Sequence, residues 1–276
     1  MKKYFNYNGR FFADDETVLS KDDRSYRYGD GLFETMKIVK GNILLEEYHF
    51  ERFSSGLEIL KFKSPVLFAK QKICEQVKEL CKKNNYEESA RVRLSVSRGG
   101  GGLYDCDNKF SYLIECWPLE QNNNTLNENG LIIDVFPDAK KSIDKFSNLK
   151  SANYLPYVMA AIWAKENKLN DALILNQHDR ICDSTIANVF WVKDEKIFTA
   201  PLSDGCVAGV MRKKILELLA RNPDQLVQEH VLTEEILLQA DEVFLTNAIS
   251  CIRWVKECRG RIYKNTICSK IFTTLG

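Results

Sequence analysis

The sequence predicts two α/β domains joined by one short linker. Its 276 residues suffice for one large domain or two of ordinary size, and 45% hydrophobic with 28% charged residues is typical of a soluble globular protein. Strand-like and helix-like runs occur on both sides of the polar, turn-rich stretch QNNNTLNENG. We therefore expect an N-terminal α/β domain over 1–120, a linker over 121–130 and a C-terminal domain over 131–276.

The N-terminal domain is expected to begin with short strands and turns up to about Gly41. A helix should follow from about Glu46 to Leu60. A second helix should run from about Pro65, a residue type favoured in the first helical turn, to Lys83. ARVRLSVS (90–97) alternates apolar and polar residues, which predicts a strand, and FSYLIECW (110–117) is a second strand beside it.

The C-terminal domain should alternate strands with helices. A strand is expected over 131–136, followed by a loop of lysines and a helix to about Asn167. The remaining expected elements are the strands DALILN and ANVFWV, a hairpin through KDEK to KIFTA, a helix from about Gly209, a helix over 233–240, and the strand EVFLT leading into a closing hairpin.

Composition disfavours several classes of partner. The 39 basic and 38 acidic residues nearly cancel, and there is no basic tract, so neither nucleic acid nor an anionic membrane is expected as a partner. No apolar window reaches the length of a membrane span, and the N-terminus lacks the apolar core of a signal peptide, so we expect a cytoplasmic protein. The nine cysteines include no CxxC pair, and Cys74 and Cys81 read as small core residues of a reducing compartment.

Lys150 is the most informative single residue. It lies in KFSNLKSANYL, between the strand expected over 131–136 and an apolar, helix-like run. A lysine where a strand leads into a helix can direct its amine into a cleft, which suits Schiff-base chemistry. By itself the position proves little, because most lysines of such a chain are solvated surface groups.

Five further blocks accompany Lys150 in a fixed order. They are GDGLFET (29–35), YHFER (48–52), DSTIANVFWV (183–192), AGVMR (208–212) and LTNA (245–248). Together with Lys150 this set resembles the class IV, or fold-type IV, aminotransferase family over roughly residues 3 to 265. The resemblance implies a two-domain fold-type IV enzyme, like D-amino-acid aminotransferase, that uses pyridoxal 5'-phosphate (PLP).

The resemblance assigns the central roles in PLP chemistry. Lys150 would hold the cofactor's aldehyde and then move the substrate's Cα proton, whereas Lys140, Lys141 and Lys145 are read as clustered charges in a loop. Asp183 would hold the proton on the ring nitrogen, with Asn188 five residues later. The family usually has glutamate there, so aspartate shortens the reach by roughly 1.5 Å, one C–C bond.

The phosphate of PLP would be bound by three parts of the chain. Arg52 matches the family's phosphate-binding arginine, although a surface charge on a helix is the alternative. Val210 and Met211 would offer backbone N–H groups at a helix N-terminus. Thr246 could add a hydroxyl group.

The substrate-binding residues follow less directly. Many class IV members carry a loop RGxGGR whose second arginine meets a substrate carboxylate, but that position here is Leu103. The carboxylate must then be held elsewhere, and the candidate residues on the substrate side are Thr35, Lys37, Arg98, Asn247 and Ala248. RGGGG (98–102) lacks a following GK[ST], so it is read as a flexible interdomain loop and not as a phosphate loop.

Other chemistries find no support. No metal is expected, because His49, His178 and His230 lie far apart without an HExxH or cysteine cluster. A serine hydrolase would need a GxSxG elbow, which is absent.

The reaction itself is left open by these blocks. The short chain, the GDGLFET block and Asn247-Ala248 favour a 4-amino-4-deoxychorismate lyase, which eliminates pyruvate and leaves 4-aminobenzoate for folate synthesis. Leu103 argues against it, because that substrate carries two carboxylates. The alternatives are an aminotransferase of branched-chain or D-amino acids and a catalytically silent relative that binds PLP. An amino-acid-like small molecule is the expected substrate, and a homodimer is the assembly that the resemblance implies.

Overall fold

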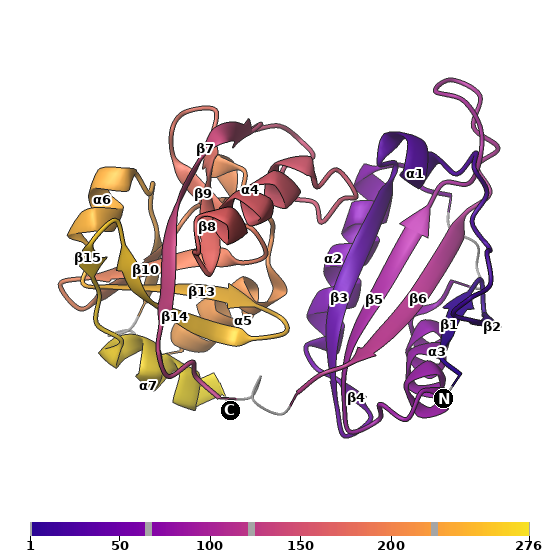
Figure 1. The fold of residues 1–276 in the computed structure, drawn as a ribbon, viewed down its shortest axis with the longest axis horizontal. Helices are drawn as coiled ribbons and strands as arrows, with labels where there is room; N and C mark the ends of the chain where they lie inside the picture. The colour runs from indigo at the N-terminus through magenta and orange to yellow at the C-terminus, as the bar shows by residue number, and fades with distance from the viewer. Residues whose placement is uncertain (1, 64–67, 121–124, 222–225, 276) are drawn as a thin grey trace. The chain divides into compact units, whose positions relative to one another are not determined.

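The structure, a computed structural model, describes residues 2–63, 68–120, 125–221 and 226–275. Its contacts divide the chain into two compact units, each of which has its own sheet and helices (Figure 1). Unit 1 comprises Met1–Asn122 and the short segment Leu149–Asn153, and unit 2 comprises Asn123–Asn148 and Tyr154–Gly276. The mixture of helices and strands confirms the expected α/β class.

Unit 1 is built on a six-stranded sheet in the order β2-β1-β6-β5-β3-β4, and its strand pairs are antiparallel. Antiparallel neighbours can be joined by short turns, which suits the closely spaced strands of this segment. Its elements are β1 (Tyr4–Tyr7), β2 (Arg10–Ala13), α1 (Arg24–Tyr28), β3 (Gly31–Val39), β4 (Asn42–Ile43), α2 (Glu46–Ile59), α3 (Lys70–Lys83), β5 (Ser89–Ser97) and β6 (Ser111–Pro118).

Helices α2 and α3 form the core of unit 1 against one face of this sheet. Leu32, Met36 and Ile38 of β3 share a buried cluster with apolar residues of both helices. Because successive strand residues point to opposite faces, Phe33 and Lys37 lie on the other face, away from the two helices. The apolar alternation predicted for β5 is confirmed, since its apolar residues are buried in the same cluster: Ala90, Val92, Leu94 and Val96.

Unit 2 contains a nine-stranded sheet that closes on itself. The strand order is β12-β11-β10-β13-β14-β7-β8-β9, β15 pairs with β14, and β9 also pairs with β10. The elements are β7 (Leu131–Lys141), α4 (Leu155–Glu166), β8 (Asp171–Asn176), β9 (Ile181–Ser184), β10 (Asn188–Lys193), β11 (Lys196–Thr199), the 3-10 helix η2 (Leu202–Asp204), α5 (Val210–Leu219), β12 (Val227–Glu229), α6 (Glu234–Gln239), β13 (Glu242–Asn247), β14 (Cys251–Cys258), β15 (Arg261–Ile262) and α7 (Thr266–Leu275).

The pairing that closes this sheet joins Asp183 to Asn188. Residues Val189, Trp191 and Val243 on the strands that follow are fully buried, so this junction rests on a tightly packed core. A closed sheet has few free edges, which restricts the movement of residues on its strands. Asp183 and Asn188 are therefore held by the most constrained part of unit 2.

The expected helices are confirmed, but the start predicted for the second one is wrong: α3 begins at Lys70, after the extended cap residue Ala69. α2 begins at Glu46 and α3 ends at Lys83, as predicted, but Pro65 and residues 121–124 of the expected linker lie outside the described residues. The strand expected over 131–136 is longer than predicted: β7 continues past Pro137 to Lys141, with a register shift between Val135 and Lys140. An irregularity of this kind lets a strand tolerate a proline.

The glycine-rich run 98–102 was wrongly read as a flexible loop between domains. It belongs to unit 1, where Gly100 pairs with Asp23 and its N–H donates to Asp107 Oδ1 at 3.1 Å. Arg24 donates to the carbonyl of Gly102 from the other side. Local hydrogen bonds thus give this loop a defined path within one unit.

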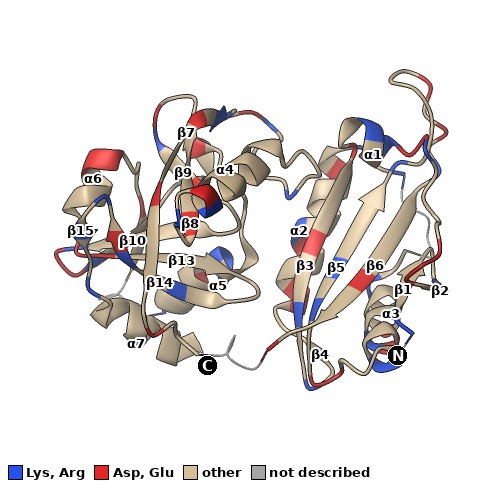
Figure 2. Ribbon diagram, viewed as in Figure 1, with Lys and Arg blue, Asp and Glu red and all other residues tan. Residues whose placement is uncertain are grey.

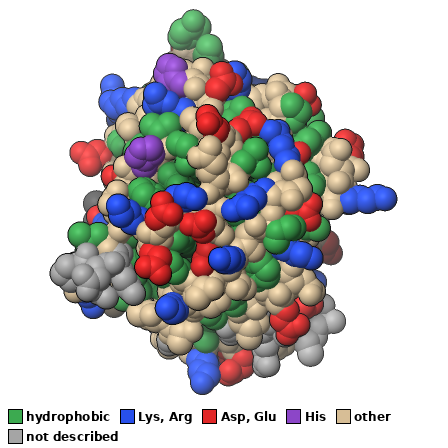
Figure 3. Space-filling model, turned by 90° about the vertical axis from the view of Figure 1, so that its left-hand side faces the viewer, with side chains coloured by type: hydrophobic (Ala, Val, Ile, Leu, Met, Phe, Trp, Pro, Cys, Tyr) green, Lys and Arg blue, Asp and Glu red, His purple; other side chains and the backbone are tan. Residues whose placement is uncertain are grey.

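The charges of the molecule are mixed. Basic and acidic residues are interspersed along the ribbon of both units (Figure 2), and the face drawn in Figure 3 carries side chains of both signs among apolar ones. Among the described residues, no helix combines the length and the apolar content that a membrane crossing requires.

Candidate functional site

The lysine segment Leu149–Asn153 is held against the first residues of β3. The backbone N–H of Phe33 donates to the carbonyl of Lys150 at 3.0 Å, and that of Ala152 donates to Gly31 at 2.9 Å. The Nζ atom of Lys150 lies 4.5 Å from the centroid of the Phe33 ring. An aromatic face attracts the charged amine and so gives the lysine a defined position.

The GDGLFET block also fits this segment at its first glycine. Gly29 has a φ of +66° and caps α1 in the left-handed conformation. A Cβ atom at Gly29 would meet Oδ1 of Asn153 at 2.5 Å, so a larger residue would have to move the Asn153 side chain, and the left-handed φ itself favours glycine. Gly29 and Asn153, which the sequence placed in separate blocks, are therefore neighbours.

Arg52 is bound to the buried carboxylate of Glu34, on the face of the sheet that α2 covers. Its Nε donates to Glu34 Oε1 at 2.8 Å and its Nη2 to Oε2 at 2.5 Å, and His49 Nδ1 lies 2.6 Å from Oε2. Burial would raise the pKa of Glu34, but the charge of Arg52 and the hydrogen bonds from His49 and Arg52 lower it to about 2. Arg52 is therefore a fixed, charged donor and not a loosely held surface residue.

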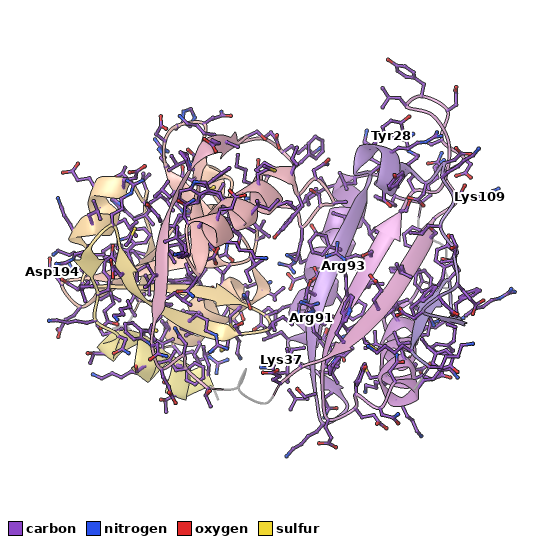
Figure 4. The ribbon with its side chains drawn as sticks, in the orientation of Figure 1. Tyr28, Lys37, Arg91, Arg93, Lys109 and Asp194 are labelled. Carbon is purple, nitrogen blue, oxygen red and sulfur yellow. The ribbon has the colours of Figure 1, made fainter. Side chains whose placement is uncertain are left out.

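Three cations gather on the opposite face of β3 and β5, and we call Lys37, Arg91 and Arg93 the basic strand face (Figure 4). Lys37 lies directly opposite Arg91. The Arg93 guanidinium lies 3.7 Å from the centroid of the Phe33 ring, the same ring that Lys150 contacts. The basic strand face thus adjoins the Lys150 amine within unit 1.

Arg98 has a different environment from the one expected for a substrate residue. Its Nε and Nη2 donate to Asp30, its Nη2 also donates to the Leu60 carbonyl at 2.7 Å, and its Nη1 donates to the Lys61 carbonyl at 3.1 Å. The guanidinium also stacks on Phe62. These contacts use Arg98 to tie the end of α2 to the sheet, and they give no support to a substrate role.

Asp183 is the centre of a second constellation, in unit 2. Its Oδ2 accepts from Tyr157 Oη at 2.8 Å and from Lys141 Nζ at 3.1 Å, and its Oδ1 accepts from Asn188 Nδ2 at 3.0 Å. The backbone N–H of Val207 donates to Oδ2 at 3.0 Å. Burial raises the pKa of Asp183, although the charge of Lys141 and the Tyr157 hydrogen bond oppose this.

The N-terminus of α5 lies close to Asn188. Val210 and Met211 begin the helix after the cap residue Gly209, where a Cβ atom would collide with Oδ1 of Asn188. Thr246 lies opposite Asn188 on β13, and its buried Oγ1 has no hydrogen-bond partner among the described residues. A buried hydroxyl without a partner is costly, which is consistent with a bound group that completes it.

The other predicted substrate residues lie on strands and turns. Thr35 is on the same face of β3 as Lys37. Asn247 ends β13, and its Oδ1 accepts from the N–H groups of Ile249 and Ser250, which closes the turn that contains Ala248. Leu103 is 63% exposed at the loop tip.

Two features were missed or misread from the sequence. Lys141 was taken for a loop charge, but it ends β7 and reaches the buried Asp183. Arg91 and Arg93 were not singled out, although two arginines two residues apart on the polar side of a predicted strand must share one face. That spacing, beside the GDGLFET block, was the available signal.

The residues present fit PLP. The cofactor needs an amine for its aldehyde, a carboxylate for its ring nitrogen and donors for its phosphate. Taken by itself, unit 1 holds an amine and a guanidinium, Lys150 and Arg52, and unit 2 by itself holds the carboxylate Asp183 and the α5 N-terminus. The orphaned Thr246 hydroxyl is the observation that favours a bound group there.

Comparisons with known proteins agree with this chemistry. The family model for amino-transferase class IV matches residues 31–258. An aminodeoxychorismate lyase of Vibrio harveyi is 31% identical over 237 residues, which cover 85% of each chain. A putative branched-chain-amino-acid aminotransferase of Methanocaldococcus jannaschii is 29% identical and covers 96% of this chain and 90% of its own.

The fold is shared with solved enzymes. A branched-chain aminotransferase from Thermoproteus uzoniensis, solved with norvaline, superimposes with a TM-score of 0.86 at 22% identity. The alignment covers 99% of this chain and 93% of that one. Another solved branched-chain amino acid aminotransferase, with a TM-score of 0.88 at 20% identity, is complexed with N-(5'-phosphopyridoxyl)-L-glutamate, and its alignment covers 99% of this chain and 93% of that one.

Proposed function

Since the chain belongs to the class IV aminotransferase family, and is therefore a PLP-dependent lyase or transaminase, we propose that it is a 4-amino-4-deoxychorismate lyase. The basic strand face is the observation that carries this choice. One of its three cations, Arg93, contacts the Phe33 ring that Lys150 also contacts, and Lys37 and Arg91 lie further along the same strands. The reaction would supply 4-aminobenzoate for folate synthesis.

The electrostatics of that face favour a substrate with two carboxylates. Lys37 lies directly opposite Arg91, and Arg93 lies opposite Glu115 of β6, so this face carries three cations and one acidic side chain, whose pKa burial raises. The lyase substrate carries two carboxylates, whereas D-alanine or L-leucine carries one. Arg91 and Arg93 thus supply the charge whose loss at Leu103 argued against the lyase.

Lys150 and Asp183 are the residues proposed to act on the reacting part of the cofactor and substrate. PLP, when bound, supplies an aldehyde for the substrate amine and a ring that withdraws electrons from Cα. Lys150 would bind the aldehyde and move the Cα proton, with the Phe33 face orienting its amine. Asp183 would keep the ring nitrogen charged, with Asn188 fixing its Oδ1.

The remaining proposed residues would bind the phosphate of PLP and orient the substrate. Val210, Met211 and Thr246 would hold the phosphate, together with Arg52, whose guanidinium Glu34 fixes. Thr35, Asn247 and Ala248 would line the substrate side. A fixed set of donors lowers the entropy lost on binding and places the reacting atoms.

We propose a cytoplasmic homodimer as the working form. Helix α4 exposes one apolar stripe, formed by Leu155, Val158, Met159 and Ile162 at helical spacing. A second copy could cover it. All nine cysteines are free thiols, as expected in a reducing compartment. Light scattering should give the mass of a dimer for the wild type. For Val158→Asp it should give a larger fraction of monomer at the same protein concentration.

The reaction is tested by two assays on one preparation. We expect 4-amino-4-deoxychorismate to yield pyruvate and 4-aminobenzoate without a keto-acid acceptor. Half-reactions with D-alanine, L-leucine and L-glutamate should be slower. Rapid amination of the cofactor by any of these, with a silent lyase assay, would establish the aminotransferase alternative.

The amine is tested by chemical reduction. Borohydride should fix PLP on the peptide that contains Lys150, and the protein should be yellow beforehand. Adduct on another lysine, or none after incubation with PLP, would remove Lys150 from its proposed role. The absence of any bound cofactor would also favour a silent relative.

The basic strand face is tested by charge removal. Lys37→Met and Arg91→Met should each raise KM for the lyase substrate by about tenfold to a hundredfold, because each removes a hydrogen bond to a charged group. Lys40→Met, at an exposed turn residue after β3, is the matched control. If all three variants have the same KM, the basic strand face does not bind the substrate.

A further inference from the structure

Lys140 and Lys141 are neighbours in sequence with opposite environments. Lys141 Nζ lies 3.1 Å from Asp183 Oδ2, and the two side chains are only 11% and 3% exposed. Lys140 Nζ pairs with Asp179 at 2.5 Å, with side chains 45% and 67% exposed. Strand alternation at the end of β7 explains the difference. The chain thus places one cation against the buried carboxylate.

The Asp183 carboxylate has nearly all of its acceptor positions filled. An ionised carboxylate offers about four lone-pair directions. Tyr157 Oη, Lys141 Nζ and the Val207 N–H donate to Oδ2, and Asn188 Nδ2 donates to Oδ1. Any further cation must share this carboxylate with the Lys141 ammonium group.

We propose that Lys141 is a positioning residue that competes with the ring nitrogen of PLP for Asp183 and so limits the positive charge on that nitrogen. The inference rests on the role proposed above for Asp183. With Lys141 charged, Asp183 ionised and the ring nitrogen protonated, the pocket holds one positive charge in excess. Without Lys141, the carboxylate and the ring nitrogen balance. An uncompensated charge in a buried pocket is strongly disfavoured.

The other titratable groups around Asp183 do not correct this imbalance. Burial, followed by the charge of Asp183, raises the pKa of Tyr157 well above its usual value, so its phenol stays neutral. Burial likewise raises the pKa of the thiols of Cys182 and Cys206. Arg212, whose charge acts on Cys206, is paired with Glu229.

A less charged ring nitrogen weakens the withdrawal of electrons from Cα. Such a ring is sufficient where the electrons leave at once with an adjacent leaving group, as in the elimination of pyruvate. It also explains an aspartate at position 183, since a shorter carboxylate held by a lysine has less need to reach the ring nitrogen. Lys141 would therefore adjust the cofactor to the proposed reaction.

The test follows the ring nitrogen directly, without an activity assay. PLP that carries the heavy nitrogen isotope in its ring is bound to each protein, and its NMR shift is measured against pH. In Lys141→Met the midpoint of the nitrogen titration should move upward by about one pH unit or more, because a like charge has been removed. Lys141→Arg should keep the wild-type curve, and so should Lys140→Met, the matched surface control.

Two further variants make the outcome decisive. Lys141→Gln repeats the neutralisation with a polar side chain and replaces Lys141→Met if that protein does not fold. Asp183→Asn should move the midpoint downward, opposite to the lysine variants. A curve unchanged in both neutral lysine variants, with Asp183→Asn shifted, would overturn the role of Lys141 alone. A curve unchanged in Asp183→Asn would remove Asp183 from the ring nitrogen, and neither result bears on lyase against transaminase.

Discussion

Two buried carboxylates, one in each unit, have pKa values that their surroundings shift in opposite directions. Glu34 and Asp183 are both 2% exposed, and each contacts a cation. Glu34 is held by two hydrogen bonds from Arg52 and by His49, which bring its pKa to about 2 against the effect of burial. Asp183 is held by one lysine and a phenol, and burial still raises its pKa.

The difference separates a structural anion from one that can respond to a bound group. A carboxylate whose charge is fully compensated by a bidentate guanidinium has no reason to exchange partners. A buried carboxylate with incomplete compensation changes its state when another charge arrives, and perturbed groups of this kind concentrate at functional sites. Glu34 thus fixes Arg52, whereas Asp183 is suited to contact the cofactor.

The largest effect is expected from a substitution of Asp183, the carboxylate with the raised pKa. Asp183→Asn should lower turnover by orders of magnitude, because the ring nitrogen loses its anionic partner, while fold and cofactor uptake stay largely intact. Steady-state rates and the absorbance of bound PLP measure the two effects separately. Asp194→Asn, at an exposed turn of unit 2 (Figure 4), is the control. Unchanged turnover in Asp183→Asn would make Asp183 an ordinary core residue.

The second prediction concerns the compensated carboxylate. The pKa of Glu34 is lowered from 4.5 to about 2 on folding, so its ion pairs stabilise the protein above about pH 4.5 and are lost as the pH falls toward 2. A shift of this size corresponds to about 3 kcal/mol at neutral pH. Glu34→Gln should lose stability of that order and show a flatter dependence on pH between these values.

Denaturant unfolding at several pH values measures the Glu34 effect. Glu58→Gln, on the exposed side of α2, is the matched control and should follow the wild type. If Glu34→Gln is as stable as the wild type at neutral pH, the contrast between the two carboxylates does not hold.

The smallest effect concerns Thr246, beside the Asp183 constellation. Thr246→Val removes a buried hydroxyl that has no hydrogen-bond partner among the described residues, so the cofactor-free protein should melt at the same temperature or higher. PLP should bind several-fold more weakly, because the loss of one hydrogen bond costs about 1 kcal/mol of binding free energy. Thr246→Ser should restore affinity. Equilibrium dialysis and thermal melting provide the readouts. A lower melting temperature with unchanged affinity would assign Thr246 to the fold alone.

The sequence singled out the proposed site residues that lie in short motifs. Lys150, Arg52 and Asp183 stood out because each lies in a motif of residue types in fixed order, and their roles stay predictions. The alternation of β5 and the limits of α2 also followed from local periodicity, which needs no knowledge of distant partners.

The contacts between blocks could not be predicted in the same way. Glu34 meets Arg52 across 18 residues and Lys141 meets Asp183 across 42, and only the packing of the strands and helices brings them together. Lys141 was misread because the predicted strand ended before Pro137. The register shift in β7 lets the strand continue past this proline, but nothing in the local sequence reports it.

The path of Leu149–Asn153 has a consequence for the modular history of the chain. These five residues belong to unit 1, yet the chain on either side of them belongs to unit 2. A gene fragment that encodes only the first 122 residues would lack the segment that pairs with Phe33 and Gly31. The two units therefore cannot be separated by a single cut, and recombination at the boundary would divide unit 1 from the lysine that it holds.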